Sequence, residues 1–114
     1  MKVLICGGRD FKDRDLLFST MRELNKTHKF TTVISGAASG ADDIGEQWGH
    51  WAELDVDMYP ARWDTHGRSA GPIRNKQMLD EGKPDLVVAF AGGKGTANMI
   101  KQAKANGVEV MEIA

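Results

Sequence analysis

Residues 85–90 (DLVVAF) give the strongest strand signal of the chain, and they lead directly into residues 91–96 (AGGKGT). An uninterrupted apolar run that ends in glycines is typical of a buried strand in a parallel sheet. A helix is predicted to follow over residues 97–105, closed by Asn106-Gly107. This segment therefore predicts a strand, a glycine-rich turn and a helix in succession.

The same succession recurs outward from this segment. Further strands are predicted at 2–6, 30–34, 56–59 and 108–113, and further helices from residue 13, over 42–53 and over 73–80. The apolar residues of segment 60–71 show no helical or strand periodicity, so this segment is expected to form a loop, with Pro72 at the start of the next helix. Alternating strands and helices predict an α/β fold, with a Rossmann-like parallel five-stranded sheet of order 3-2-1-4-5 and helices on both faces.

Composition favours one globular domain over residues 1–114 and argues against several functional classes. The chain is 41% apolar and 27% charged, with a formal net charge of −1. A dedicated duplex-DNA or membrane-surface protein would carry a basic excess. With one cysteine, Cys6, and no zinc-ligand spacing, we expect neither disulfide, metal nor cofactor. The first residues are too short for a signal-peptide core, so a cytoplasmic location is expected.

Three glycine-rich turns, at 7–10, 36–42 and 92–96, each follow a strand of the predicted sheet. Ligands of open parallel sheets bind outside the carboxyl ends of the strands, where the strand order reverses, so all three turns are expected to converge there. Glycines allow backbone N–H groups to approach an anion, and a helix N-terminus adds unpaired donors. The predicted ligand-binding residues are Gly8, Arg9, Asp10, Gly36, Ser39, Gly40, Asp42, Trp63, Arg74, Asn75, Gly92, Gly93, Lys94, Gly95 and Thr96.

Several of these residues also have a plain structural explanation. Glycine, serine and aspartate favour helix starts in any strand-to-helix turn, and Arg9 or Lys94 could be surface charges. Arg74 is predicted to lie in the first turn of its helix, where a cation is unfavourable unless an anion is bound. Neither a complete GxGxxG fingerprint nor a GxxxxGK[ST] motif is present, which argues against a P-loop kinase or ATPase.

Acidic and aromatic residues near the turns leave alternatives open. Asp10 and Asp42 could accept ribose hydroxyls or act in acid–base catalysis, and Asp42 could equally cap its helix. Trp63 could stack on a base, or it could pack in the core or in a lid. Trp48 and Trp51 are predicted to lie in the core, and Cys6 is expected to be a small buried side chain.

In order along the chain, GGRDF (7–11), SGAASGAD (35–42), ARWD (61–64), AGPIRNKQM (70–78) and GGKGT (92–96) resemble the YspA-like branch of the SLOG superfamily. Relatives of this branch include LOG-type phosphoribohydrolases and the DNA-uptake family DprA/Smf. The resemblance implies a Rossmann-like fold that binds nucleotides or nucleotide-derived ligands, and a homodimer by analogy with LOG-type enzymes.

LOG-type enzymes cleave the N-glycosidic bond of nucleoside monophosphates with an arginine and a glutamate from motifs of the form RKxxM and PGGxGTxxE. In this sequence Arg74 keeps the arginine, Asn75 replaces the lysine, and Met99 stands at the glutamate position. A thioether cannot accept a proton, so the resemblance favours binding of a nucleotide-derived ligand, such as an ADP-ribose-like or cyclic nucleotide signal, for sensing or sequestration. The alternatives are an N-glycosidase in which Asp10, Asp42, Glu46 or Asp64 replaces the glutamate, and single-stranded nucleic-acid binding, which the absence of a basic stripe makes unlikely.

Overall fold

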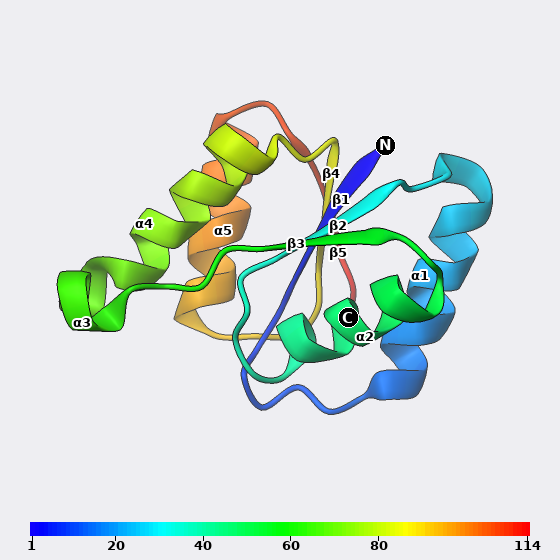
Figure 1. Ribbon diagram of the computed structural model, residues 1–114, viewed down its shortest axis with the longest axis horizontal. Helices are drawn as coiled ribbons and strands as arrows, with labels where there is room; N and C mark the ends of the chain where they lie inside the picture. The colour runs from blue at the N-terminus through cyan, green and yellow to red at the C-terminus, as the bar shows by residue number, and fades with distance from the viewer.

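The computed structural model describes all 114 residues and confirms the predicted sheet. Five parallel strands pair in the order β3-β2-β1-β4-β5 (Figure 1). Their bounds are β1 Lys2–Cys6, β2 Thr32–Ser35, β3 Asp55–Met58, β4 Leu86–Ala89 and β5 Glu109–Glu112. The strand order reverses between β1 and β4, which pair with Leu4 opposite Val87 and Cys6 opposite Ala89. The strands that flank the reversal therefore end at the same edge of the sheet.

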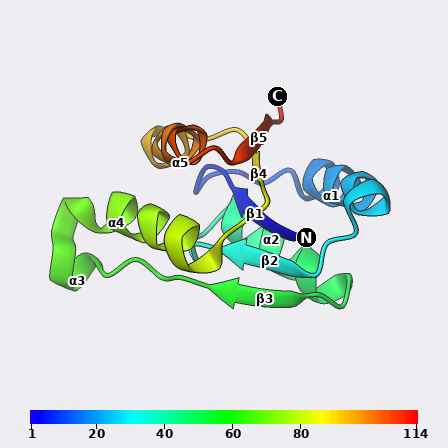
Figure 2. The ribbon, with the colours of Figure 1, turned by 90° about the horizontal axis from the view of Figure 1, so that it is seen from above.

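Helices cover both faces of this sheet, α1 and α2 on one and α4 and α5 on the other (Figures 1 and 2). They span α1 Arg14–His28, α2 Ala41–Trp51, α4 Ala70–Gln77, continued by a π-helical turn over Met78–Gly82, and α5 Lys94–Ala105. Asp13 caps α1 by accepting the N–H of Leu16 at 3.0 Å.

The side chains of alternate residues in the central strand β1 pack into two separate hydrophobic cores, one on each face of the sheet. Val3 and Ile5 of β1 pack with Leu17 and Trp48 on the α1–α2 side. Leu4 and Cys6 pack on the other side, with Met78, Leu79, Met99 and Ala103 from α4, the π-turn and α5. This alternation in a strand buried on both faces fixes the register of β1.

The prediction that residues 60–71 form a loop is wrong. This segment contains a short helix α3 (Trp63–His66) and a 3-10 turn (Gly67–Ser69), and α4 then begins at Ala70, two residues before Pro72. These turns bury no side chain of their own, so they leave no apolar period in the sequence. In both views α3 lies at the far end of the molecule from α1.

The two tryptophans of α2 have different environments. Trp48 is fully buried, as predicted, and its indole N–H has no hydrogen-bond partner. Trp51 is 62% exposed and lies 6.1 Å, ring centroid to ring centroid, from Phe18 of α1. The prediction that Trp51 lies in the core is therefore wrong: its ring lies at the surface beside Phe18, while Gly49 of the same turn packs against Val33 of the sheet. No helix is both long and apolar enough to span a bilayer.

Candidate functional site: a pocket at the carboxyl edge of the sheet

A pocket of about 750 Å³ lies at the carboxyl ends of β1 and β4, at the predicted position. Its volume is in the range of small-molecule sites. Four basic side chains and two acidic ones line it. The structure places around it the predicted residues Gly8, Arg9, Asp10, Asp42, Trp63, Arg74, Asn75, Gly92, Gly93, Lys94, Gly95 and Thr96.

One wall of the pocket is the N-terminus of α5. The first helical hydrogen bond runs from Ala97 to Gly93 at 3.0 Å, so the N–H groups of Lys94, Gly95 and Thr96 lack an intrahelical acceptor. No side chain caps this terminus, and its first turn contains no acidic residue. The wall therefore presents free donors at the positive end of the helix dipole.

Thr96 adds a hydroxyl to the same wall. The residue is only 8% exposed, lines the pocket, and makes no side-chain hydrogen bond within the protein. A Cβ at Gly92 would collide with the Thr96 hydroxyl oxygen, so only glycine fits beside it. Gly93 and Gly95, by contrast, have nothing within 4 Å of such a Cβ, which leaves the approach to the free N–H groups open.

The second predicted turn, residues 36–42, does not supply a matching cradle. At the start of α2, Ala41 donates its N–H to the Gly8 carbonyl at 3.1 Å. Gly40, at φ 76°, is packed so closely against the Gly8 and Arg9 carbonyls that a Cβ would clash. Gly36, Ser39 and Gly40 do not line the pocket, because this turn packs against the first one.

From this turn only Ala38 and Asp42 reach the pocket. Asp42 is 7% exposed, and its Oδ2 accepts the Ala38 N–H at 3.2 Å. Burial raises the pKa of Asp42 to about 6, although the Ala38 N–H and the nearby Arg74 act in the opposite direction. The carboxyl group therefore titrates close to neutral pH.

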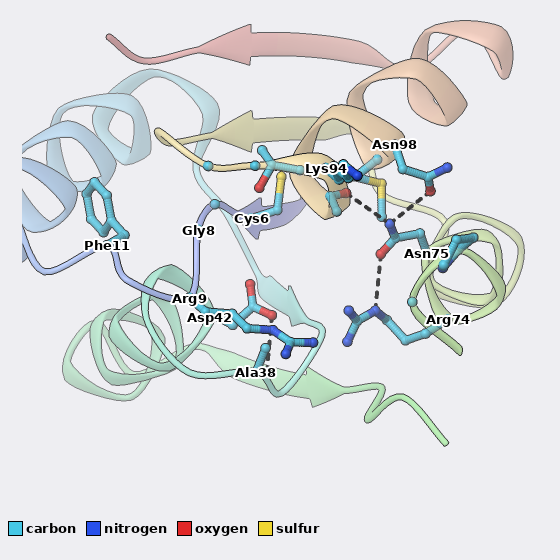
Figure 3. A pocket seen from close by; sticks show the side chains of 18 of the residues that line it. Cys6, Gly8, Arg9, Phe11, Ala38, Asp42, Arg74, Asn75, Lys94 and Asn98 are labelled. Atoms are coloured by element: carbon cyan, nitrogen blue, oxygen red, sulfur yellow. Dashed lines mark hydrogen bonds between the residues drawn. The ribbon is translucent and has the colours of Figure 1, made fainter. Parts of the chain in front are cut away.

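Arg74 faces Asp42 from α4 (Figure 3). Its Nη1 donates to the Gly36 carbonyl, and its Nε donates to Asn75 Oδ1 at 3.1 Å. A Cβ built on Gly36 would lie 2.6 Å from Arg74 Nη1 and 2.9 Å from Asp42 Oδ2, which explains the glycine. Arg74 lies in the last turn of α4, so its predicted place in the first turn is wrong and the dipole argument does not apply.

Asn75 links the arginine to the α5 wall. Its amide nitrogen donates to the Gly95 carbonyl at 3.3 Å and to Asn98 Oδ1 at 3.1 Å (Figure 3). Gln102 then donates to the same Asn98 oxygen at 2.7 Å. The buried Asn75 amide thus accepts a hydrogen bond from Arg74 and donates two to α5, which fixes the position of Arg74 relative to α5.

Arg9 and Trp63 are in contact at the mouth of the pocket. The Arg9 guanidinium carbon lies 5.0 Å from the centroid of the Trp63 ring, a cation–π distance. Trp63 is 47% exposed, so the ring is not a core residue. Contact between the first turn and α3 brings both predicted residues to the entrance.

Cys6 and Met99 lie deeper in the pocket. Both line it and both are buried. Burial raises the pKa of the Cys6 thiol to about 12, with a further contribution from Asp42, so the group stays protonated at neutral pH and is not a nucleophile. The thioether of Met99 supplies no charge at its position.

The four carboxylates suggested as catalytic groups are not equivalent. Asp10 is exposed and lines the pocket, whereas Asp42 is buried in it. Glu46 lies outside the lining and accepts the Ser35 hydroxyl at 2.6 Å. Asp64 is exposed on α3 and is not part of the pocket either. Of the four, the structure therefore brings only Asp10 and Asp42 together around the pocket.

Arg68 and Asn98 line the pocket but were not predicted to do so. Asn98 lies one helical turn beyond Lys94 and Gly95, and it would have been found if α5 had been predicted to begin at Lys94. Arg68 lies in the 3-10 turn, where no periodic signal marks the side of the chain that faces inward.

Comparison with known sequences identifies the family of the chain. A model of the YspA, cpYpsA-related SLOG family matches residues 1–66, more than half of the chain. The chain belongs to this SLOG family. It is also 33% identical over 119 residues to the Gene 61 protein of Mycobacterium phage D29, covering 96% of this chain and 94% of that protein. SLOG membership is consistent with nucleotide-related binding or processing.

Proposed function

We propose that this SLOG protein binds a phosphate-bearing nucleotide or nucleotide derivative for sensing or sequestration. The observation that carries the proposal is the uncapped N-terminus of α5. Three N–H groups without intrahelical acceptors, the unpartnered Thr96 hydroxyl and the Lys94 ammonium all belong to one wall of a 750 Å³ pocket. A phosphate group would satisfy these donors together.

The rest of the pocket fits the remainder of such a ligand. Trp63 offers a partly exposed aromatic ring at the entrance, on which a base could stack, and Arg9 lies against the same ring. Met99 provides an apolar surface where LOG-type enzymes carry their glutamate. Binding without cleavage is therefore the leading proposal, with ADP-ribose-like compounds and cyclic nucleotides among the candidate ligands.

The test measures thermal unfolding with a panel of nucleotides, ADP-ribose, cyclic dinucleotides and inorganic phosphate. A ligand present at 100 times its Kd stabilises the fold by about 2.7 kcal/mol, which raises the Tm by several degrees in a domain of this size. The compound is then recovered and analysed by chromatography. A rise in Tm with an intact compound supports binding; no shift with any member of the panel would contradict it.

Thr96→Val tests the wall itself, because valine has nearly the shape of threonine and carries a methyl group in place of the hydroxyl. We expect Kd to rise about tenfold, since a hydrogen bond to a charged group contributes about 1.5–3 kcal/mol. Thr20→Val, on α1 and away from the pocket, is the matched control. Equal Kd values for Thr96→Val and the wild type would remove the hydroxyl from the site.

A second candidate is hydrolysis of an N-glycosidic bond, and Asp42 is the observation that favours it. This buried carboxyl group has a pKa of about 6 and faces Arg74. In such a reaction water would add at the sugar carbon and the base would leave. Free base in the chromatogram, abolished by Asp42→Ala, would establish this activity; intact nucleotide after prolonged incubation would exclude it for that compound.

A further inference from the structure

The Asp42 carboxylate has an unused oxygen that faces the pocket. Its Oδ2 accepts the Ala38 N–H, whereas no protein group donates to Oδ1. The residue is 7% exposed, and Figure 3 shows the side chain directed into the pocket. The carboxylate is 7% exposed and keeps little of its hydration, so a ligand that donates a hydrogen bond to Oδ1 would offset part of the cost of its burial.

Arg74 is the group opposite this oxygen, and it is also only partly satisfied. Its Nη1 and Nε each have an acceptor, in Gly36 and Asn75, while its Nη2 has none within the protein. The two side chains do not form an ion pair within 4.0 Å: the salt bridges of the molecule all lie elsewhere. A gap therefore separates a free acceptor from a free donor.

The chemistry of this gap selects its occupant. A hydroxyl group can donate to Asp42 and accept from Arg74 at the same time. A phosphate is anionic at neutral pH and would be repelled by the carboxylate, and an ammonium group cannot accept from the guanidinium. Two neighbouring hydroxyls would reach both the carboxylate and the guanidinium more fully than one.

We propose that the Asp42–Arg74 gap binds the 2′,3′-diol of a ribose whose phosphate lies at the N-terminus of α5, so that the pocket selects ribonucleotides over deoxyribonucleotides. The inference rests on the proposed function for the position of the phosphate. Lys94 and Asn98 mark that wall, and Asp42 and Arg74 mark the other part of the same pocket (Figure 3). Asp42 is the residue that determines specificity, and Arg74, held by Gly36 and Asn75, assists it.

The experiment measures Kd by calorimetry for nucleoside mono- and diphosphates in ribo, 2′-deoxy and 3′-deoxy forms, with inorganic phosphate and pyrophosphate as probes of the α5 wall alone. A site built to bind a hydroxyl discriminates strongly against an analogue that lacks it. We expect the ribo form to bind at least about tenfold more tightly than either deoxy form in the wild type. In Asp42→Ala the ratio of the Kd for a deoxy form to the Kd for the ribo form should fall to about one, while the affinity for pyrophosphate does not decrease.

Two further variants keep the test decisive. Asp42→Asn preserves the size of the side chain if the alanine variant folds poorly, and it should narrow the ratio by removing the negative charge. Asp43→Ala, on the next and exposed residue of α2, outside this pocket, should leave the ratio unchanged.

The outcomes separate this inference from the proposed function. Binding of pyrophosphate together with equal affinities for ribo and deoxy forms would overturn the diol site and leave the phosphate site in place. A ribose preference that survives in Asp42→Ala would also overturn it. No binding of any phosphate probe or nucleotide would overturn the proposed function and the inference with it.

Discussion

The N-termini of α2 and α5 lie at the same edge of the sheet, and each helix begins after a glycine-rich turn. Residues 36–42 and 92–96 are alike in composition, yet the two helix starts have opposite surroundings. At α2 the Ala41 N–H is bound to Gly8, and Asp42 and Asp43 place two acidic residues in the first turn. Neither helix start has a side-chain cap, but at α5 the first turn holds no acidic residue and none of its N–H groups is bound by another loop. The dipole of α2 is neutralised by its own chain, whereas that of α5 is available to a ligand.

Because of this difference, the two turns contribute different groups to the pocket. The α2 turn is a packing element that contributes one buried carboxylate, and the α5 turn is a set of open donors. A glycine-rich turn after a parallel strand therefore predicts a place at the binding edge, but it does not predict whether its donors are free. The free donors depend on whether another loop has already bound them, and here the Gly8 carbonyl accepts the first of those at α2, the Ala41 N–H.

The largest effect on stability is expected from Gly40→Ala. Gly40 has φ 76° and ψ −126°, a region that other residues rarely adopt, and a Cβ would collide with backbone oxygens of Gly8 and Arg9. We expect the free energy of unfolding to fall by about 3 kcal/mol or more, measured by urea denaturation.

Gly95→Ala is the matched control at the other helix. A Cβ there meets nothing within 4 Å, and alanine favours the helix by up to about 1 kcal/mol over glycine. Its stability should be unchanged or slightly raised. If both variants lost stability equally, the contrast between a packed and an open helix start would be wrong.

The second largest effect is expected in the pH dependence of the free energy of unfolding, to which Asp42 contributes. Burial raises its pKa from the ordinary 3.8 to about 6, with Glu46 adding to the shift and Arg74 and Arg9 opposing it. Between these values the folded state binds more protons than the unfolded state, so stability falls as pH rises from about 4 to about 6 and this contribution is then constant. The cost at neutral pH is on the order of 3 kcal/mol, since one pKa unit corresponds to about 1.4 kcal/mol.

Asp42→Asn removes the titrating group and keeps its shape. Urea denaturation at pH 4.5 and pH 7.5 should show the variant more stable than the wild type at pH 7.5, and the difference should shrink at pH 4.5. A wild type that gains stability from pH 4.5 to 7.5 through this residue would mean that the carboxylate is paired rather than costly.

A binding effect of about tenfold is expected when α5 is made to resemble α2. Gly93→Asp places a carboxylate at the N-cap position, where nothing obstructs a side chain, and it would accept the N–H groups now free. The Kd for the nucleotide found in the panel should rise about tenfold, while stability is kept.

Asp43→Asn is the control at α2, since it removes an acidic residue from the first turn of the helix without touching the pocket. Calorimetry should give the wild-type Kd for this variant. If Gly93→Asp also bound like the wild type, the anion site would have to lie elsewhere.

Much of the fold could be predicted because its signals are local. The first four strands are short runs that lead into turn residues, and the first helix, predicted from residue 13, follows Asp13, which caps it. The segment over 60–71 could not be predicted, since α3 and the 3-10 turn bury none of their own side chains and are stabilised by contacts such as Arg9 on Trp63. The exposure of Ser39 and the placement of Arg74 against the Gly36 carbonyl also depend on distant contacts.

The smallest effect is expected at Lys94, and it tests whether the α5 wall acts through its backbone. Lys94 is exposed, so its ammonium is screened by water and salt, while the Gly95 and Thr96 donors are fixed by the helix. Lys94→Ala should raise Kd only about threefold, equivalent to about 0.6 kcal/mol, and the difference should shrink in high salt. Lys101→Ala, on the same helix and outside the pocket, is the matched control and should bind like the wild type. A loss of a hundredfold at Lys94 would show that the side chain, and not the open helix start that distinguishes α5 from α2, carries the phosphate.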